Sequence, residues 1–331
     1  MRTTLILGAG ASVHCGFPTG PGLLDAIIRY SSILNFFEGF YPLRERSKIS
    51  RIRRVIRDQQ PPSIDFFLKM NRRDAEVAAM GKHMVATTLL IKQIGALRGE
   101  PNWYGAIVQF ILDCIEAGDL KRLDDLKIVT FNYDLSIEGF ILRALHSLSF
   151  LCEAEREEIL MRVVSNVLHV YGSLFDFLAP PDEYKKEFPD WRTRRLQIFN
   201  SAVYRKGSSF FAEARRFGNN IRIIGDPDTD DVVRKAREWI AGAEQVFILG
   251  YGFHADNNEL LGLNALPTKD QFYFVTNFRN PLKVREKIIG FFPHAVHENS
   301  LAGGRMGKPG TAYISVRSVN KALETEHSFV D

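Results

Sequence analysis

Short apolar runs that end at glycine or polar residues constrain the fold of this sequence more than any other feature. The first run, residues 3–7, leads directly into a glycine-rich turn at residues 8–12. Runs of about four to eight β-branched and aromatic residues with such boundaries are typical of buried strands. Comparable runs follow at residues 127–131, 167–171, 246–249 and 272–276. Since helical patterns separate them, we predict an α/β fold: a Rossmann-like, mostly parallel sheet with helices on both faces and an inserted helical subdomain.

The helical patterns gather between the first and second predicted strands. A helix is expected to begin near Leu23, and the clearest pattern covers residues 102–117, with Gly118 as a stop signal. We therefore predict a Rossmann-like domain at 1–30 and 125–300, a helical insertion at 31–124 and a C-terminal tail at 301–331.

Weaker patterns complete the second half of the chain. Thr229 is expected to cap a helix whose first turn holds Asp230 and Asp231. The other patterns predict a strand at 221–224, a surface insertion at 175–220, and a tail that is glycine-rich at 303–310 and loosely held at its end.

Composition excludes a membrane-spanning or secreted protein. No apolar run reaches the roughly 18 residues that cross a bilayer. The apolar run Leu5-Ile6-Leu7 is too short for the core of a signal peptide. We therefore expect a cytoplasmic protein that has no membrane contact.

The cysteines and histidines do not form a recognisable metal site. Cys15, Cys114 and Cys152 are far apart and form no CxxC pair, which argues against a disulfide framework and a cysteine zinc site. His294 and His297 have no evident third ligand. We expect no metal.

The positive charge is modest but locally concentrated. A net charge of +4 permits contact with polyanions without requiring it. Seven basic residues lie between Arg44 and Arg57. Such a run suits either a solvated helix face or a contact surface for nucleic acid or a protein partner, and the sequence leaves both open.

Polar and glycine clusters stand at the ends of the predicted strands. They occupy residues 8–12, 132–134, 250–256 and 276–277, and His169 lies near the end of another strand. In doubly wound sheets, ligands bind in the crevice beyond the carboxyl ends of the strands. We therefore predict one pocket to which several strand ends contribute.

The glycine turn after the first predicted strand favours nucleotide binding. Gly8 and Gly10 let the backbone pass close to a phosphate, which free N–H groups can face, although tight packing alone would also explain them. The dehydrogenase fingerprint is incomplete, because Val13 stands at its sixth position and no acidic residue follows a second strand. Hydride transfer is therefore disfavoured.

Two polar positions have structural explanations as well as chemical ones. Asn132-Tyr133-Asp134 after a strand would suit a helix cap. His169 alone would suit a hydrogen-bonded core position, but it alternates with Leu168 and Val170 and so faces the opposite side of its strand. That alternation favours the crevice or the polar side of the sheet.

Five motifs in order resemble the bacterial sirtuin-like domain, in the NAD-consuming branch used in anti-phage defence. The resemblance spans about residues 1–298. Its motifs are LILGAGASVHCGFPTG at 5–20, SIDFFL at 63–68, VTFNYD at 129–134, LHVYGSL at 168–174 and ILGYGFHADN at 248–257.

The resemblance implies roles for particular residues. Asn132 would contact the nicotinamide ribose and help place the attacking water, and His169 would be the catalytic base. These residue types suit the chemistry, because an amide both donates and accepts hydrogen bonds and a neutral histidine accepts a proton. The NAD-binding positions would be Gly8, Ala9, Gly10, Ala11, Ser12, Phe17, Asp65, Asp134, Gly250, Phe253, Asp256 and Asn277.

Within that set, Gly8 to Ser12 would hold the pyrophosphate and Asp134 would support the nicotinamide pocket. Gly250, Phe253 and Asp256 would line the adenosine side, with Asn277 near the adenine ribose. Asp65 matches a family position of less defined role, and His254 is expected at the pocket rim.

The resemblance implies an NAD⁺ glycohydrolase that cleaves NAD⁺ to nicotinamide and ADP-ribose and depletes it in abortive anti-phage defence. NAD⁺ would be the substrate, and no metal would be needed. The resemblance further implies a homo-oligomer whose activity is gated by oligomerisation or by a partner such as a HerA-type translocase ATPase or a short Argonaute. The sequence contains no recognisable nucleic-acid-binding module, so we expect no direct nucleic-acid binding.

Two alternatives stay open. The first is an NAD-dependent protein deacylase, which the absence of paired zinc cysteines disfavours. The second is a non-enzymatic subunit that senses NAD or ADP-ribose and controls a partner. The presence of both Asn132 and His169 disfavours that subunit, because binding alone has little need for a base.

Overall fold

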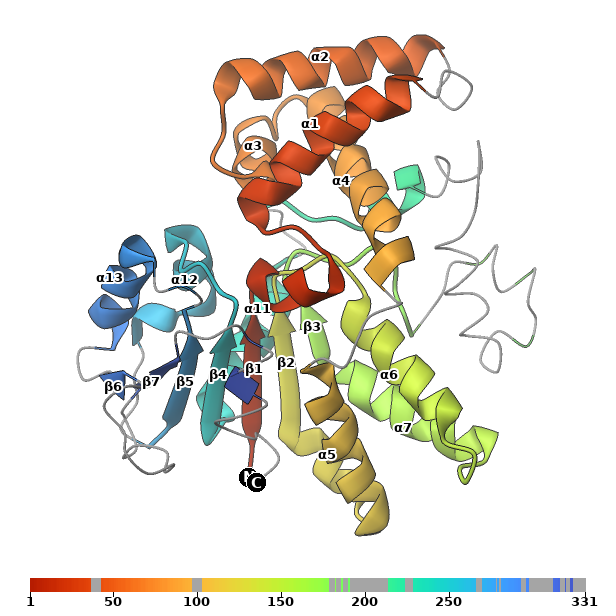
Figure 1. Cartoon of the computed structure of the whole chain (residues 1–331), viewed down its shortest axis with the longest axis vertical. Coiled ribbons are helices and arrows are strands. Elements are labelled where there is room, and N and C mark those ends of the chain that lie inside the picture. Colours follow the sequence, from red (N-terminus) through yellow and green to blue (C-terminus); the bar gives the residue numbers. More distant parts are fainter. Residues whose placement is uncertain are drawn as a thin grey trace.

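The chain folds around one parallel sheet with a group of helices above it (Figure 1). The computed structural model describes residues 1–36, 43–96, 103–178, 214–223, 229–265, 270–277, 281–292, 296–297 and 312–315, with single residues at 182, 186, 190, 279, 319, 322 and 323. Several features discussed above lie outside the described residues: most of the predicted insertion at 175–220, the segment 303–310, the side chain of Arg44, and the residues Ile224 and His294.

Seven strands of the described chain form the sheet, and neighbouring strands pair in parallel. Their order is β3-β2-β1-β4-β5-β7-β6. This confirms the predicted Rossmann-like α/β fold. The strands are β1 (Thr3–Leu7), β2 (Leu126–Thr130), β3 (Val167–His169), β4 (Gln245–Leu249), β5 (Phe272–Thr276), β6 (Val296–His297) and β7 (Ala312–Ser315).

The central strands are buried along their whole length. Every residue of β1 and β4 is buried, and Leu5 pairs with Ile128 on one side and Phe247 on the other. Strands covered on both faces have continuous apolar runs rather than alternating ones, which is why these segments stand out in the sequence.

The strand order contains a reversal between β1 and β4. From β1 the chain adds β2 and then β3 on one side, and it returns to place β4 on the other side of β1. The loops that follow β1 and β4 therefore leave the sheet in opposite directions. At such a reversal they open a crevice beyond the carboxyl ends of the strands.

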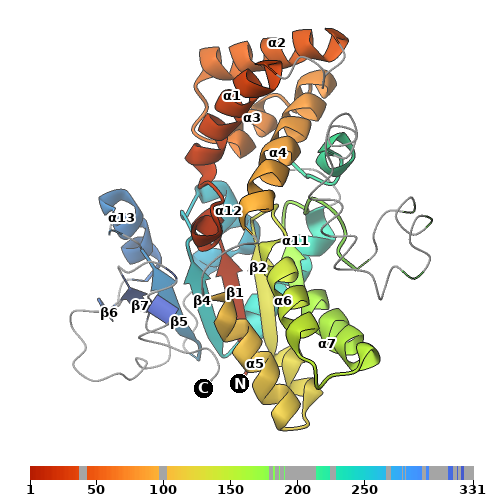
Figure 2. The same ribbon diagram turned by 45° about the vertical axis from the view of Figure 1, so that its right-hand side comes forward.

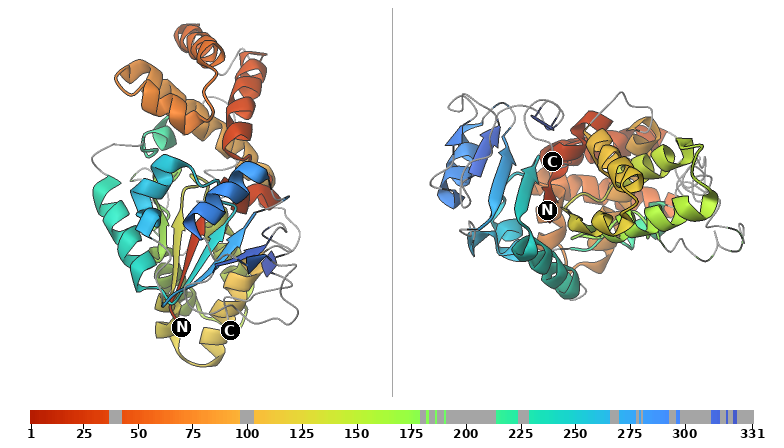
Figure 3. Two further views of the ribbon diagram at one scale, coloured as in Figure 1. Left: turned by 90° about the vertical axis from the view of Figure 1, so that its left-hand side faces the viewer. Right: turned by 90° about the horizontal axis from the view of Figure 1, so that it is seen from below.

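Helices flank both faces of the sheet, with α11 on the face opposite α5 (Figure 3). Helix α5 packs against α6, and α6 packs against α7. The flanking helices are α5 (Tyr104–Glu116), α6 (Ser136–Ser147), α7 (Glu153–Ser165), α11 (Asp230–Gly242), α12 (Ala255–Leu261) and α13 (Leu282–Phe291). Among the described helices, none is both long and apolar enough to cross a bilayer.

A separate helical group lies beyond the carboxyl ends of the strands (Figures 1 and 2). Helix α2 buries Ile49, Ile52 and Ile56, which recur at helical spacing, and α4 contacts the other three helices. The group consists of α1 (Gly20–Phe36), α2 (Leu43–Gln59), α3 (Ile64–Met70) and α4 (Ala75–Ala96). Helix α5, which the sequence places in the same predicted insertion, lies beside the sheet instead.

Two local predictions need correction. The described part of the predicted strand at 221–224 is not a strand: the Arg222 N–H donates to the Tyr171 carbonyl (2.8 Å) beyond the end of β3, without a continuing ladder. Thr229 precedes α11 as predicted, but its side chain makes no capping hydrogen bond. Its φ of −85° and ψ of −18° are already helical, whereas a capping residue needs an extended backbone.

Candidate functional site

A cavity of about 700 Å³ lies over the carboxyl ends of the central strands. The loops after β1, β2, β4 and β5 form its floor, and the starts of α1 and α3 form its roof. It thus occupies the reversal point between β1 and β4. Eight of the predicted site residues line it: Gly8, Ala9, Gly10, Asp65, Asn132, Gly250, Asp256 and Asn277.

The other predicted site residues lie behind the cavity wall. They are Ala11, Ser12, Phe17, Asp134, Phe253 and His169. Phe253 is fully buried and has a φ of 50°, a left-handed conformation that aromatic residues rarely adopt. His254, expected at the rim, is exposed and lines the cavity. The pKa of His254 is lowered, mainly because its ring is partly desolvated at the cavity and secondly because of the positive charge of Lys287.

Glycines allow the two loops at the reversal point to touch through their backbones. A Cβ on Gly8 would lie 2.5 Å from the Gly250 carbonyl oxygen, and Gly250 has a φ of +59°. The Gly10 N–H donates to the Gly250 carbonyl (2.9 Å), and the Ala11 N–H donates to the Gly8 carbonyl (2.9 Å). Close packing therefore explains these glycines, and the two N–H groups are already engaged within the protein.

The Asn132 side chain on the cavity wall is held by a buried hydrogen-bond chain. Its Nδ2 donates to Ser12 Oγ (2.8 Å), and Ser12 Oγ donates to the Asp134 carboxylate (3.1 Å). Because the single hydroxyl proton of Ser12 goes to Asp134, Ser12 must accept from Asn132. This fixes the orientation of the amide and leaves Asn132 Oδ1 as the acceptor available to a ligand.

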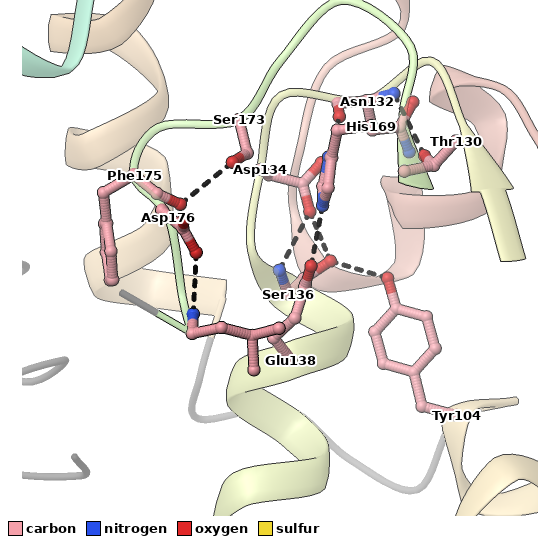
Figure 4. A network of polar contacts seen from close by, with 11 residues as sticks. Tyr104, Thr130, Asn132, Asp134, Ser136, Glu138, His169, Ser173, Phe175 and Asp176 are labelled. Carbon is pink, nitrogen blue, oxygen red and sulfur yellow. Dashed lines mark hydrogen bonds and ion pairs between the residues drawn. The ribbon is translucent and has the colours of Figure 1, made fainter. Parts of the chain in front are cut away.

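Asp134 anchors the start of α6 (Figure 4) and, through Ser12, also the Asn132 side chain. Its carboxylate accepts from the Ser136 N–H (3.1 Å) and from the Ser136 hydroxyl, which also contacts the Tyr104 hydroxyl (2.7 Å). Burial raises the pKa of Asp134. Asp134 thus bonds to the first residue of α6, although the N-cap position itself is Leu135 and has no side-chain cap, and the Asn132 side chain turns to Ser12 instead.

His169 lies directly behind Asn132, and both of its ring nitrogens have partners (Figure 4). Nδ1 lies 2.7 Å from the Asn132 carbonyl oxygen, and Nε2 lies 2.6 Å from Glu138 Oε1. Since a carbonyl only accepts, Nδ1 carries a proton. Burial lowers the pKa of His169, but the Glu138 carboxylate and the Asn132 carbonyl outweigh it, so the net pKa is raised.

The sequence reasoning missed Glu138. Its side chain is only 3% exposed, although glutamate is rarely buried without a partner. A signal was present: Glu138 lies in the first turn of α6, six positions after Asn132, among residues that α6 buries. An acidic residue on the apolar face of a helix indicates a buried polar partner.

Polar contacts connect the roof to the floor of the cavity. The Tyr133 hydroxyl, from the loop after β2, donates to Asp65 Oδ1 of α3 (2.5 Å). Lys69 at the end of α3 pairs with Asp256 of α12 (2.9 Å). Burial raises the pKa of Asp65. Phe66 of α3 lines the cavity and is 41% exposed, so its ring is accessible to a ligand there.

The Cys15 thiol lies next to His14, which lines the cavity. Burial and the nearby Asp134 raise the pKa of Cys15 to about 12, so this buried thiol stays protonated beside His14. Across the described ranges, no group of three or more His, Cys, Asp or Glu side chains is arranged to hold a metal ion.

Comparisons with known proteins give no family assignment. No protein-family model matches the chain, and the search of curated proteins found no match. The likeness to the sirtuin-like domain therefore rests on the five sequence motifs, and what it implies about function is a proposal.

Proposed function

We propose that this protein is an NAD⁺ glycohydrolase, which hydrolyses the bond between nicotinamide and ribose. One observation carries the proposal. The fixed amide of Asn132 lies on the wall of the cavity at the β1–β4 reversal, with His169 bonded directly to the Asn132 backbone behind it. The ordered sirtuin-like motifs place the same two residues in the reaction.

The cavity suits a nucleotide-sized ligand. Its volume of about 700 Å³ falls within the range of about 300–1,000 Å³ that is usual for small-molecule sites. The backbone at Gly8 and Gly10 carries no side chains that would keep a pyrophosphate away. Phe66 offers an exposed ring that a base or nicotinamide can cover.

The reaction needs few protein groups. Water attacks the anomeric carbon, the carbon–nitrogen bond breaks, nicotinamide leaves as a neutral molecule with the bonding electrons, and a base takes the proton from water. Asn132 Oδ1 would hold the water or a ribose hydroxyl, because its Nδ2 is occupied by Ser12. Such positioning supplies much of the rate enhancement of enzymes.

His169 would take up the proton after a small rearrangement. In the structure Nδ1 faces the Asn132 carbonyl and Nε2 faces Glu138, so neither nitrogen offers a lone pair to the cavity. Loss of the Nδ1 proton to solvent and release of Nδ1 from the carbonyl would expose a lone pair that can act as the base. This requirement suits an enzyme that is inactive until a substrate or partner rearranges its site.

The wider biological proposal rests on the motif resemblance. Loss of NAD⁺ would halt an infected cell, and a partner such as a HerA-type ATPase or a short Argonaute, or self-assembly, would release the activity. The exposed residues of α2 within the basic stretch 44–57 are a candidate contact surface for that partner.

A second candidate is a sensing subunit that binds NAD or ADP-ribose without cleaving it. One observation favours it: His169 does not line the cavity, and both its nitrogens are engaged. Binding at the cavity would then act on the two contacts between roof and floor, the Tyr133–Asp65 hydrogen bond and the Lys69–Asp256 ion pair.

NAD⁺ turnover by the purified protein separates these functions. Wild-type protein should release nicotinamide and ADP-ribose, separated by chromatography, and Asn132→Ala and His169→Ala should each lose at least about 100-fold in rate. Asn219→Ala and His146→Ala, both exposed, are matched controls that should retain the rate.

Other outcomes would replace the proposal. Tight NAD⁺ binding with no turnover, alone and with candidate partners, would establish the sensing subunit. Consumption of NAD⁺ only in the presence of acyl-lysine peptides, with acyl-ADP-ribose as product, would establish a deacylase.

A further inference from the structure

Glu138 is a buried acidic residue whose only hydrogen-bond partner among the described residues is His169. Its side chain is 3% exposed, and Oε1 lies 2.6 Å from His169 Nε2 (Figure 4). Its second oxygen, Oε2, is buried and makes no hydrogen bond within the described part of the chain. Burial of a carboxylate with an unsatisfied oxygen is costly, so a purely structural role is a poor explanation for it.

The geometry determines which histidine nitrogen can act. The Asn132 carbonyl contacts Nδ1, on the side of the residue that lines the cavity, whereas Glu138 contacts Nε2 from within α6. Glu138 and Nε2 share one proton, and Nδ1 carries another. A proton can therefore pass between the imidazole and the cavity only through Nδ1.

We propose that Glu138 is a positioning residue for His169: it holds Nε2, so that proton transfer with water or a ribose hydroxyl runs through Nδ1. This inference rests on the proposed glycohydrolase function. Acid–histidine pairs in hydrolases are arranged in the same way: a buried carboxylate fixes the tautomer of the histidine and stabilises the protonated ring.

The charges around His169 are acidic. Glu138 of α6 and Asp134 of the loop after β2 both act on it, and Tyr104 of α5 and Cys15 surround Asp134. Burial and then Asp134 raise the pKa of both Tyr104 and Cys15, so these two groups stay neutral. Without the Glu138 charge, the largest of the influences that raise the pKa of His169 is lost, so this pKa falls relative to the wild type.

The consequence is a pH dependence with a definite sign. A general base works only when it is unprotonated, so the rate should rise with pH through the raised pKa of His169. In Glu138→Gln the amide oxygen still accepts from Nε2–H but the charge is gone. The rising limb of the rate should then move to lower pH.

The test compares pH profiles of NAD⁺ hydrolysis by wild type, Glu138→Gln and Glu138→Leu. Glu138→Gln should shift the rising limb of kcat to lower pH. Glu138→Leu, which also removes the acceptor, should lower kcat by about 100-fold, and KM should change less than about twofold because Glu138 does not line the cavity. An unshifted limb in a folded Glu138→Gln protein would overturn the proposal.

A second measurement is independent of activity. In protein labelled with ¹⁵N-histidine, the His169 ring signals, assigned with His169→Gln, should titrate at lower pH in Glu138→Gln than in wild type. An unchanged titration would overturn the role of Glu138. A lowered titration, with no NAD⁺ turnover by the wild type or any variant alone or with candidate partners, would support the contact of Glu138 with His169 and overturn the proposed function instead.

Discussion

The floor and the roof of the cavity are built in different ways. On the floor, the loops after β1 and β4 touch through the backbone atoms of Gly8, Gly10 and Gly250. The roof is tied to the floor by side chains, and its Lys69–Asp256 pair is 34% and 44% exposed. Backbone contacts cannot adjust, whereas exposed side chains can. The floor is therefore the rigid part of the cavity, and the roof is the part that can move to admit a ligand.

Adding one methyl group to the floor should have the largest effect. In Gly250→Ala the new Cβ would lie 2.2 Å from the Ala11 nitrogen, on a backbone with φ of +59°. We expect a loss of about 2–5 kcal/mol in the free energy of unfolding, measured by urea denaturation. The control is Gly105→Ala in α5, which meets no atom within 4 Å and should be neutral or stabilising. Equal stability of the two variants would refute the rigid floor.

The histidine behind the floor should contribute a smaller, pH-dependent amount. Because the folded-state pKa of His169 is raised, its stabilisation is complete below about pH 6.5 and is lost as pH rises through the folded pKa. Below that range His169→Gln should cost about 1.5–3 kcal/mol, and the difference from wild type should shrink at higher pH.

His146→Gln is the matched control for this measurement. Burial lowers the pKa of His146, so its effect should be small and of opposite sign, appearing as pH falls. A wild-type advantage over His169→Gln that grows with pH would show that the paired, protonated ring is not the stable form.

The roof should show the smallest effects, and they should depend on salt. Lys69→Ala should cost less than about 1 kcal/mol, and the difference should vanish near 1 M salt, because the pair is exposed and screened. Tyr133→Phe removes the hydrogen bond to Asp65 and should cost about 1 kcal/mol at any salt concentration. Denaturation at low and high salt checks both, and a salt-independent loss in Lys69→Ala would show that the roof is as rigid as the floor.

The sequence predicts the sheet well because the signals for its strands are local. Residues 3–7 and 245–249 are buried on both faces. Their apolar runs indicate this burial without any information about the neighbouring strands. The strand β7 at 312–315 was not predicted, because it has only four residues and lies within a segment that was interpreted as a tail. Residues 221–223 show the opposite error: a strand was predicted there and none is present. Residues with a high preference for strands form one only where a partner strand is available.

The site is less predictable because its contacts join distant elements. Asn132 follows a strand, and its place at the carboxyl end of β2 follows from the fold class alone. The contact of Glu138 with His169 depends on how α6 packs beside β3, which no local pattern encodes. The hydrogen bond from the Gly10 amide to the Gly250 carbonyl likewise appears only when β4 is in place.

The position of β4 has a consequence for how the protein is made. Thr3 pairs with Gln245, more than 240 positions later in the chain. Contacts between residues so far apart in the sequence form slowly. During synthesis, β1 cannot pair with β4 until β4 has left the ribosome. The nascent chain therefore cannot assemble the cavity floor until most of its length has been translated. We expect folding order itself to keep a growing chain from binding a ligand at this cavity.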